Sequence, residues 1–222
     1  MASKVRRAPP QAGTDAASAV SWRDRQRSRT VNRILDGAFQ LFLESGFHGT
    51  SMDRICEQTG ISKPTIYNHF RNKEALFTAI IKRATDSILT VIHSPPRKNQ
   101  SLESALYRFS LNYADIVLSA EMISLHRLVL GEAQRFPELG SLYYDSGYLS
   151  SQRGLEDYLR FFAKQGDLEI ANYEDASNDF WELVLGYLHT YLLCNPSKAI
   201  SKTQKQRQLK RGIRNFLTLY GT

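Results

Sequence analysis

The chain has 222 residues, of which 42% are hydrophobic and 23% are charged, and its formal net charge is +7. This composition is typical of an ordinary folded protein and excludes the disordered and collagen-like classes. No stretch reaches the roughly 18 apolar residues of a membrane-spanning helix, and no apolar segment follows the basic N-terminus, so we expect a cytoplasmic protein without a membrane partner. Two cysteines, Cys56 and Cys194, are too few for a disulfide framework.

The charge is distributed unevenly along the chain. Residues 1–30 carry a net +5 and residues 31–93 a net +1, whereas residues 94–196 carry −6 and residues 197–222 carry +7. An acidic surface repels phosphates, so any contact with nucleic acid should come from the first ninety residues or from the last twenty-five.

The N-terminal part reads as a basic arm followed by short helices. Residues 1–25 contain mainly Ala, Ser, Pro and basic side chains, and we expect a flexible arm. A first helix is predicted from Arg27 to Gly46, with Phe42 and Phe47 paired across a left-handed ending. A second runs from Met52 to Gly60 by the same pattern, which places Cys56 in the core.

Two further start signals follow. Ser62 can cap a helix over Lys63–Phe70 with Pro64 in its first turn, and Asn72 can cap a helix from Lys73 to about His93. Helical periodicity then continues through residues 102–117, 123–130, 138–165, 173–194 and 204–220, and no segment reads as a strand. The prediction is an all-α chain of about nine helices, in which residues 26–93 form a small N-terminal domain and residues 94–222 a larger helical bundle.

Residues 51–70 form two short predicted helices with Gly60 in the turn, which is the helix-turn-helix arrangement. Ile66 and Phe70 would face the supporting helices, so the other positions of the second helix would point toward DNA. Helix N-termini on either side offer backbone N–H groups to phosphate. The candidate DNA contacts are Thr50, Ser51, Lys63, Thr65, Tyr67, His69 and Lys73.

The segments ILDGAFQLFLESGFHGTSMDRI and TGISKPTIYNHFRNKEALF, within Arg33 to Phe77, strongly resemble the DNA-binding domain of TetR-type transcriptional regulators. Gly37 departs mildly from this pattern, since family members often have alanine there, and the change costs about 1 kcal/mol of helix propensity. The resemblance implies a homodimer with an effector-binding domain and a dimer interface from the last two helices, and the seven candidate contacts match family positions that commonly meet DNA. A second segment, HRLVLGEAQRFPELG from His126 to Gly140, looks like part of regulators of multidrug or organic-compound efflux.

Most of the aromatic residues lie between residues 94 and 196, where ordinary core packing accounts for many of them. An apolar pocket with a few convergent polar groups is nevertheless what an organic effector requires. The candidate pocket residues are Phe109, Tyr113, Met122, His126, Tyr144 and Trp181.

The final helix carries an apolar stripe bordered by basic side chains. We expect this stripe to contribute to the dimer interface, and the rival interpretation is a second DNA-binding surface. The stripe consists of Leu209, Ile213, Phe216, Leu217 and Tyr220.

Other interpretations compete with some of these assignments. His69 could bind a metal, but no second ligand stands at the required spacing, and we expect neither metal nor cofactor. No nucleophile-elbow context or catalytic grouping is present, so we expect no enzyme. Tyr67 could instead pack in the domain core.

The sequence as a whole predicts a ligand-responsive dimeric repressor that binds a palindromic double-stranded operator and is released by a small organic effector, with control of an efflux system as one role. Two alternatives stay open. One is a helical small-molecule binding protein or enzyme with a vestigial helix-turn-helix, and the other is an architectural DNA binder that uses the basic arm and tail.

Overall fold

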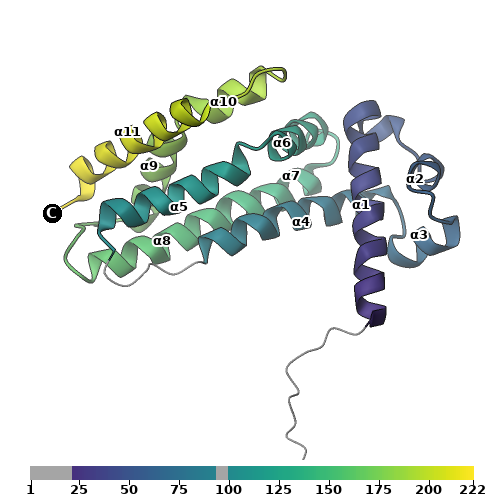
Figure 1. Ribbon diagram of the computed structural model, residues 1–222, viewed down its shortest axis with the longest axis horizontal. Coiled ribbons are helices and arrows are strands. Elements are labelled where there is room, and N and C mark those ends of the chain that lie inside the picture. The colour runs from purple at the N-terminus through teal and green to yellow at the C-terminus, as the bar shows by residue number, and fades with distance from the viewer. Residues whose placement is uncertain (1–21, 94–99) are drawn as a thin grey trace, which may run out of the picture.

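The computed structural model describes residues 22–93 and 100–222, so most of the predicted arm of residues 1–25 lies outside the described residues. Within these two ranges the protein forms eleven α-helices and one π-helical turn, and no strand occurs in them. The all-α prediction is therefore confirmed. Figure 1 shows α1, α2 and α3 standing at one end of a longer helical bundle, with α4 reaching from one part to the other.

The elements follow one another along the chain without long interruptions. The first part contains α1 (Trp22–Gly49), α2 (Met52–Thr59), α3 (Lys63–His69) and α4 (Lys73–Ile92). The second part contains α5 (Leu102–Val117), α6 (Ala120–Glu132), α7 (Pro137–Tyr143), the π turn η1 (Tyr144–Leu149), α8 (Ser150–Ala163), α9 (Tyr173–Leu185), α10 (Tyr187–Cys194) and α11 (Lys202–Tyr220).

Local signals explain the short helices of the first part. The side chains of Ser51, Ser62 and Asn72 accept hydrogen bonds from backbone N–H groups in the first turns of α2, α3 and α4. Gly60 ends α2 in the left-handed conformation with φ of 62°, and Gly46 interrupts α1 with φ of 71°. The caps predicted at Ser62 and Asn72 and the endings predicted at Gly46 and Gly60 are confirmed, and the cap at Ser51 is an additional finding.

The core of the first part is aromatic. Phe42 and Phe47 lie 5.3 Å apart between ring centroids, so the pair expected across Gly46 is present, and Phe47 also stacks on Phe77 of α4 at 5.3 Å. Cys56 is only half-buried at the edge of this core. The prediction that Cys56 is a core residue was therefore too strong.

The second part has more breaks than the sequence predicted. The expected helix over residues 173–194 divides at Gly186, whose φ is 52°. The segment 138–165 divides into α7, η1 and α8 because the π turn changes the hydrogen-bond register at Tyr144–Leu149. These breaks explain why the structure contains more helices than the predicted nine.

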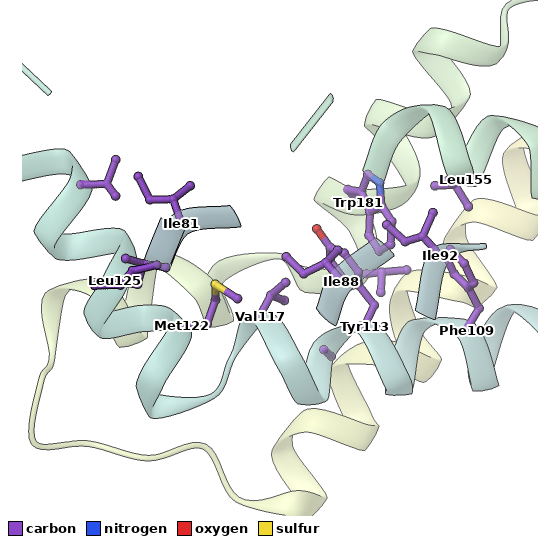
Figure 2. Close-up of a cluster of buried hydrophobic side chains, with 14 of the residues drawn as sticks. Ile81, Ile88, Ile92, Phe109, Tyr113, Val117, Met122, Leu125, Leu155 and Trp181 are labelled. Carbon is purple, nitrogen blue, oxygen red and sulfur yellow. The ribbon is translucent and has the colours of Figure 1, made fainter. Parts of the chain in front are cut away.

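One buried cluster joins the two parts. Figure 2 shows Ile88 and Ile92 of α4 packed among side chains from α5, α6, α8 and α9, including Tyr113, Met122 and Trp181. Because α4 also begins beside α3, this one helix belongs both to the cluster and to the first part.

Candidate DNA-reading surface and effector cavity

The helix α3 presents a clear polar face to solvent. Ile66 is fully buried and Phe70 is 9% exposed, while Tyr67 is 44% exposed. Tyr67 therefore lies on the surface, against the alternative that it packs in the core. Asn68 is exposed next to it, and its amide can donate to and accept from the edge of an adenine. Sequence reasoning missed Asn68, although its place beside Tyr67, between Ile66 and Phe70, could have indicated it.

The start of α3 is organised by short polar contacts. Ser62 Oγ and Thr65 Oγ1 lie 2.8 Å apart, and Lys63 Nζ lies 2.6 Å from Asp53 Oδ1 of α2. The hydrogen bond and charge of Asp53 raise the pKa of the exposed Lys63 ammonium. Because both partners are exposed, this ion pair is weak, and Lys63 can exchange Asp53 for a phosphate or a base.

Thr50 and Lys73 use their side chains inside the domain. Thr50 is 2% exposed, and its hydroxyl donates to the backbone carbonyls of Leu41 at 3.1 Å and Gly46 at 2.9 Å. Lys73 Nζ donates to the carbonyls of Phe47 at 2.8 Å and Thr50 at 3.2 Å and lies 4.5 Å from the centroid of the Phe47 ring. These two residues tie the end of α1 to the starts of α2 and α4.

The other two candidate contacts differ in access. Ser51 is exposed, but its hydroxyl oxygen already caps α2 by accepting from Arg54 N–H at 3.2 Å. His69 is half-buried at the end of α3, with its ring 6.3 Å from that of Phe70. The side chains of α3 that are most accessible to DNA are therefore those of Lys63, Tyr67 and Asn68.

The glycine that departs from the family pattern has a packing reason. A Cβ atom at Gly37 of α1 would lie 2.4 Å from Cγ2 of Thr59 at the end of α2. Thr59 is buried, and its hydroxyl donates to the Ile55 carbonyl at 2.7 Å, so this methyl group cannot easily rotate away. Arg33 adds hydrogen bonds to the Thr59 carbonyl, which holds α1 and α2 in close contact.

The second part contains a cavity of about 460 Å³ between α4, α5, α6, α7, η1, α9 and α10. Tyr113, Met122, His126, Tyr144 and Trp181, five of the six candidate pocket residues, line it. The sixth residue, Phe109, does not line the cavity and packs against Tyr158 and Trp181.

Two histidines from distant parts of the chain meet at this cavity. His126 Nδ1 lies 3.1 Å from His189 Nε2, with ring centroids 4.8 Å apart. Burial, together with the neighbouring His189, lowers the pKa of His126 to about 4, and burial also lowers the pKa of His189. Both imidazoles are therefore neutral near pH 7.

The remaining lining is largely aromatic and apolar. Burial raises the pKa of Tyr113 and of Tyr143 to about 12, so both hydroxyls keep their protons. Tyr144 and Tyr148 stack with centroids 5.1 Å apart and are partly exposed. Sequence reasoning missed His189, which lies 63 residues from His126, because only the tertiary fold brings the two together.

The candidate dimer stripe lies mostly inside the subunit. Leu209, Ile213 and Phe216 are at most 1% exposed, because α11 packs against α9 and α5. A partner subunit cannot reach these three side chains. Leu217 and Tyr220 are half-buried, and the Tyr220 hydroxyl donates to Asp179 at 2.6 Å.

Across residues 22–93 and 100–222, no three His, Cys, Asp or Glu side chains gather closely enough to hold a metal ion. No helix in these ranges is long and apolar enough to cross a membrane.

A helix-turn-helix (α2 and α3) beside a separate helical domain is the architecture of a DNA-binding regulator. The family models agree with this class, since residues 34–80 match the bacterial regulatory proteins of the tetR family and residues 104–222 match the C-terminal domain of AefR-like transcriptional repressors. The chain belongs to the TetR family of DNA-binding transcriptional regulators. The family consists of regulators rather than enzymes.

Related proteins resemble the chain over most of its length. The flavonoid-responsive regulator FrrA is 31% identical over 87% of this chain and 98% of that chain, with a TM-score of 0.73. A TetR-family regulator from Mesorhizobium loti is 24% identical over 88% of this chain and 98% of that one, with a TM-score of 0.77. The biofilm operon repressor IcaR of Staphylococcus aureus is 24% identical over 85% of this chain and 97% of its own length.

Proposed function

We propose that the protein is a dimeric cytoplasmic repressor that binds a palindromic operator through α3 and is released by a small organic effector in the cavity. The observation that supports DNA reading most directly is the exposed face of α3, where Lys63, Tyr67 and Asn68 stand clear of the core. In the proposed complex the two α3 helices enter successive major grooves of the operator.

Operator binding is tested on the DNA upstream of the protein's own gene. Footprinting and gel-shift titration should show protection of a palindromic site, with random DNA of equal length bound more weakly at physiological salt. Equal affinity for both fragments would refute the proposal and favour the architectural DNA binder. No shift with either fragment, together with tight ligand binding or turnover, would favour the vestigial helix-turn-helix.

The role of α3 is tested with a matched pair of lysine variants. If the Lys63 ammonium contacts a guanine, Lys63→Ala should weaken binding to the operator by about 1–3 kcal/mol. If it contacts a phosphate, the substitution should weaken binding to all DNA sequences equally and lower by about one the slope of log affinity against log salt concentration. Lys164→Ala removes the same charge from an exposed position after α8 and should leave binding unchanged. Equal effects of the two substitutions would mean that only bulk charge matters.

Dimerisation is proposed through the surfaces of α10 and α11 that stay accessible. Tyr187 is 58% exposed and Leu219 is 64% exposed, and α11 also carries the exposed Arg207, Lys210 and Arg214. Sedimentation analysis should show a dimer that Tyr187→Glu with Leu219→Glu weakens, while Leu130→Glu on α6, another exposed apolar position, does not. A monomer in the unaltered protein would contradict this proposal.

The effector is proposed to be an organic compound, and the regulated genes are proposed to include an efflux system for it. FrrA is flavonoid-responsive, and a flavonoid is an aromatic compound. The cavity of the present chain is lined by aromatic side chains, which suit an aromatic ligand. The segment from His126 to Gly140, which resembles efflux regulators, contributes His126, Val129, Leu130, Ala133 and Gly140 to the wall.

A further inference from the structure

The cavity disfavours charged ligands. Among the described residues that line it, Glu182 is the only one with a formal charge, and its side chain is exposed. No lysine or arginine lies in that lining to bind an anion. An anion would have no partner in this lining, and the one carboxylate, Glu182, is exposed to water, so an uncharged molecule is favoured.

The rings around the cavity favour a flat aromatic molecule. Tyr113 and Trp181 lie 4.0 Å apart between centroids on one part of the wall, and Tyr144 and Tyr148 stack on another. Aromatic rings pack favourably with further rings in stacked or tilted arrangements. A volume of about 460 Å³ admits a molecule of two or three fused or linked rings.

The histidine pair specifies the polar group of the ligand. In two neutral imidazoles that share one hydrogen bond, one ring donates and the other accepts. Whichever tautomer is present, the second nitrogens of the two rings comprise one donor and one acceptor. Within residues 22–93 and 100–222, neither ring makes another hydrogen bond, so both functions are available to a ligand.

A hydroxyl group suits either free end of this pair, because it can accept from the free ring N–H or donate to the free ring nitrogen. A carboxylate can only accept and carries a charge, and an ammonium can only donate. The indole N–H of buried Trp181 also has no partner among the described residues.

We propose that the cavity binds an uncharged aromatic compound with a hydroxyl group, held by the His126–His189 pair. This inference rests on the proposed function, in which the cavity is the effector site, and it names the chemical class of the effector. The histidines act as ligand-specificity residues, and the tyrosine and tryptophan rings supply the apolar contact area.

A matched ligand series tests the proposal on the unaltered protein. Calorimetric titration at pH 7.5 compares para-phenylphenol with para-methoxybiphenyl, which cannot donate, and with biphenyl-para-carboxylate, which is charged. We expect para-phenylphenol to bind about tenfold more tightly than either analogue, because each analogue leaves a buried polar group unsatisfied or a charge unpaired. Equal or tighter binding of the carboxylate or the ether, or binding of none of the three, would overturn the proposal.

Substitution of the pair supplies the second arm. In the variant with His126→Phe and His189→Phe, the preference for the hydroxyl should vanish while para-methoxybiphenyl still binds, which shows that the cavity persists. His93→Phe alters an exposed histidine of the same kind and should keep the full preference. A hydroxyl preference that survives the double substitution would overturn the proposal.

The operator titration separates this inference from the proposed function. Operator binding without a hydroxyl preference would overturn the ligand class and leave the DNA-binding function standing. A clear hydroxyl preference without sequence-selective DNA binding would refute the repressor and leave the ligand class standing.

Discussion

Lys63 and Lys73 were both predicted to contact DNA, but their side chains differ in exposure and in hydrogen-bond partners. Lys63 lies exposed on α3 beside Asp53, while Lys73 is half-buried and bonded to two backbone carbonyls. Hydrogen bonds from a charged donor to buried acceptors stabilise a fold more than exposed ion pairs do. Lys63 is therefore accessible to DNA in the proposed complex, whereas Lys73 holds the end of α1 to the starts of α2 and α4.

The difference predicts that substitution of Lys73 lowers stability far more than substitution of Lys63. Lys73→Met should lower the free energy of unfolding by about 1–3 kcal/mol, because the carbonyls of Phe47 and Thr50 lose their donor. Lys63→Met should change it by less than about 0.5 kcal/mol. Urea titration of both variants measures this, and equal losses would contradict the assignment.

The histidine pair makes stability depend on pH. In the unfolded chain His126 takes up a proton as the pH falls through about 6.5, whereas in the folded chain it does so only near 4. The contribution of neutral His126 is therefore complete above pH 6.5 and is lost as the pH falls toward 4.

Thermal or urea unfolding between pH 7 and pH 4 measures this dependence. After allowance for the partial exposure of the ring, the loss attributable to His126 should be about 1 kcal/mol. The variant His126→Phe should lose correspondingly less stability over this window, and His93→Phe serves as the exposed control. Identical pH profiles for His126→Phe and the unaltered chain would contradict the prediction.

At the scale of elements, local chemistry determined what could be predicted. A capping residue acts on backbone groups within three or four residues, so the sequence alone located the end of α2 at Gly60 and the starts of α3 and α4 after Ser62 and Asn72. Contacts over long sequence separations could not be predicted in this way. The burial of Thr50 and the meeting of His126 with His189 depend on how whole helices pack.

Tight helix packing gives a prediction for α11. A Cβ atom at Gly212 would lie 2.3 Å from the Leu183 carbonyl oxygen of α9, and backbone cannot move aside cheaply. Gly212→Ala should therefore lower the free energy of unfolding by about 1–3 kcal/mol. The control Gly131→Ala, with open space around the added methyl group, should raise it by about 0.5–1 kcal/mol through helix propensity. Thermal melts compare them, and a neutral Gly212→Ala would show that α9 and α11 pack more loosely.

At the scale of the whole molecule, helix α4 and the side chain of Met122 connect the cavity to the DNA-binding helices α1–α3. Ile88 of α4 lines the cavity, and α4 begins at Lys73 beside α3. Met122 of α6 lines both this cavity and a second one of about 360 Å³ between α1, α4, α5 and α6. A ligand that displaces Met122 or Ile88 therefore acts on helices that support the DNA-binding domain (Figure 1).

This connection predicts a reciprocal effect between ligand and DNA. If saturating para-phenylphenol lowers operator affinity by a given factor, saturating operator must lower the affinity for para-phenylphenol by the same factor, because both describe one coupling free energy. We expect a factor of about 5–150, which corresponds to about 1–3 kcal/mol. Gel-shift titrations at fixed ligand and calorimetric titrations at fixed operator measure the two sides. Met122→Ala should reduce this coupling factor without abolishing ligand binding or operator binding, because it removes the side chain shared by the two cavities. A ligand that binds with no effect on DNA affinity would show that the cavity is uncoupled from the DNA-binding helices.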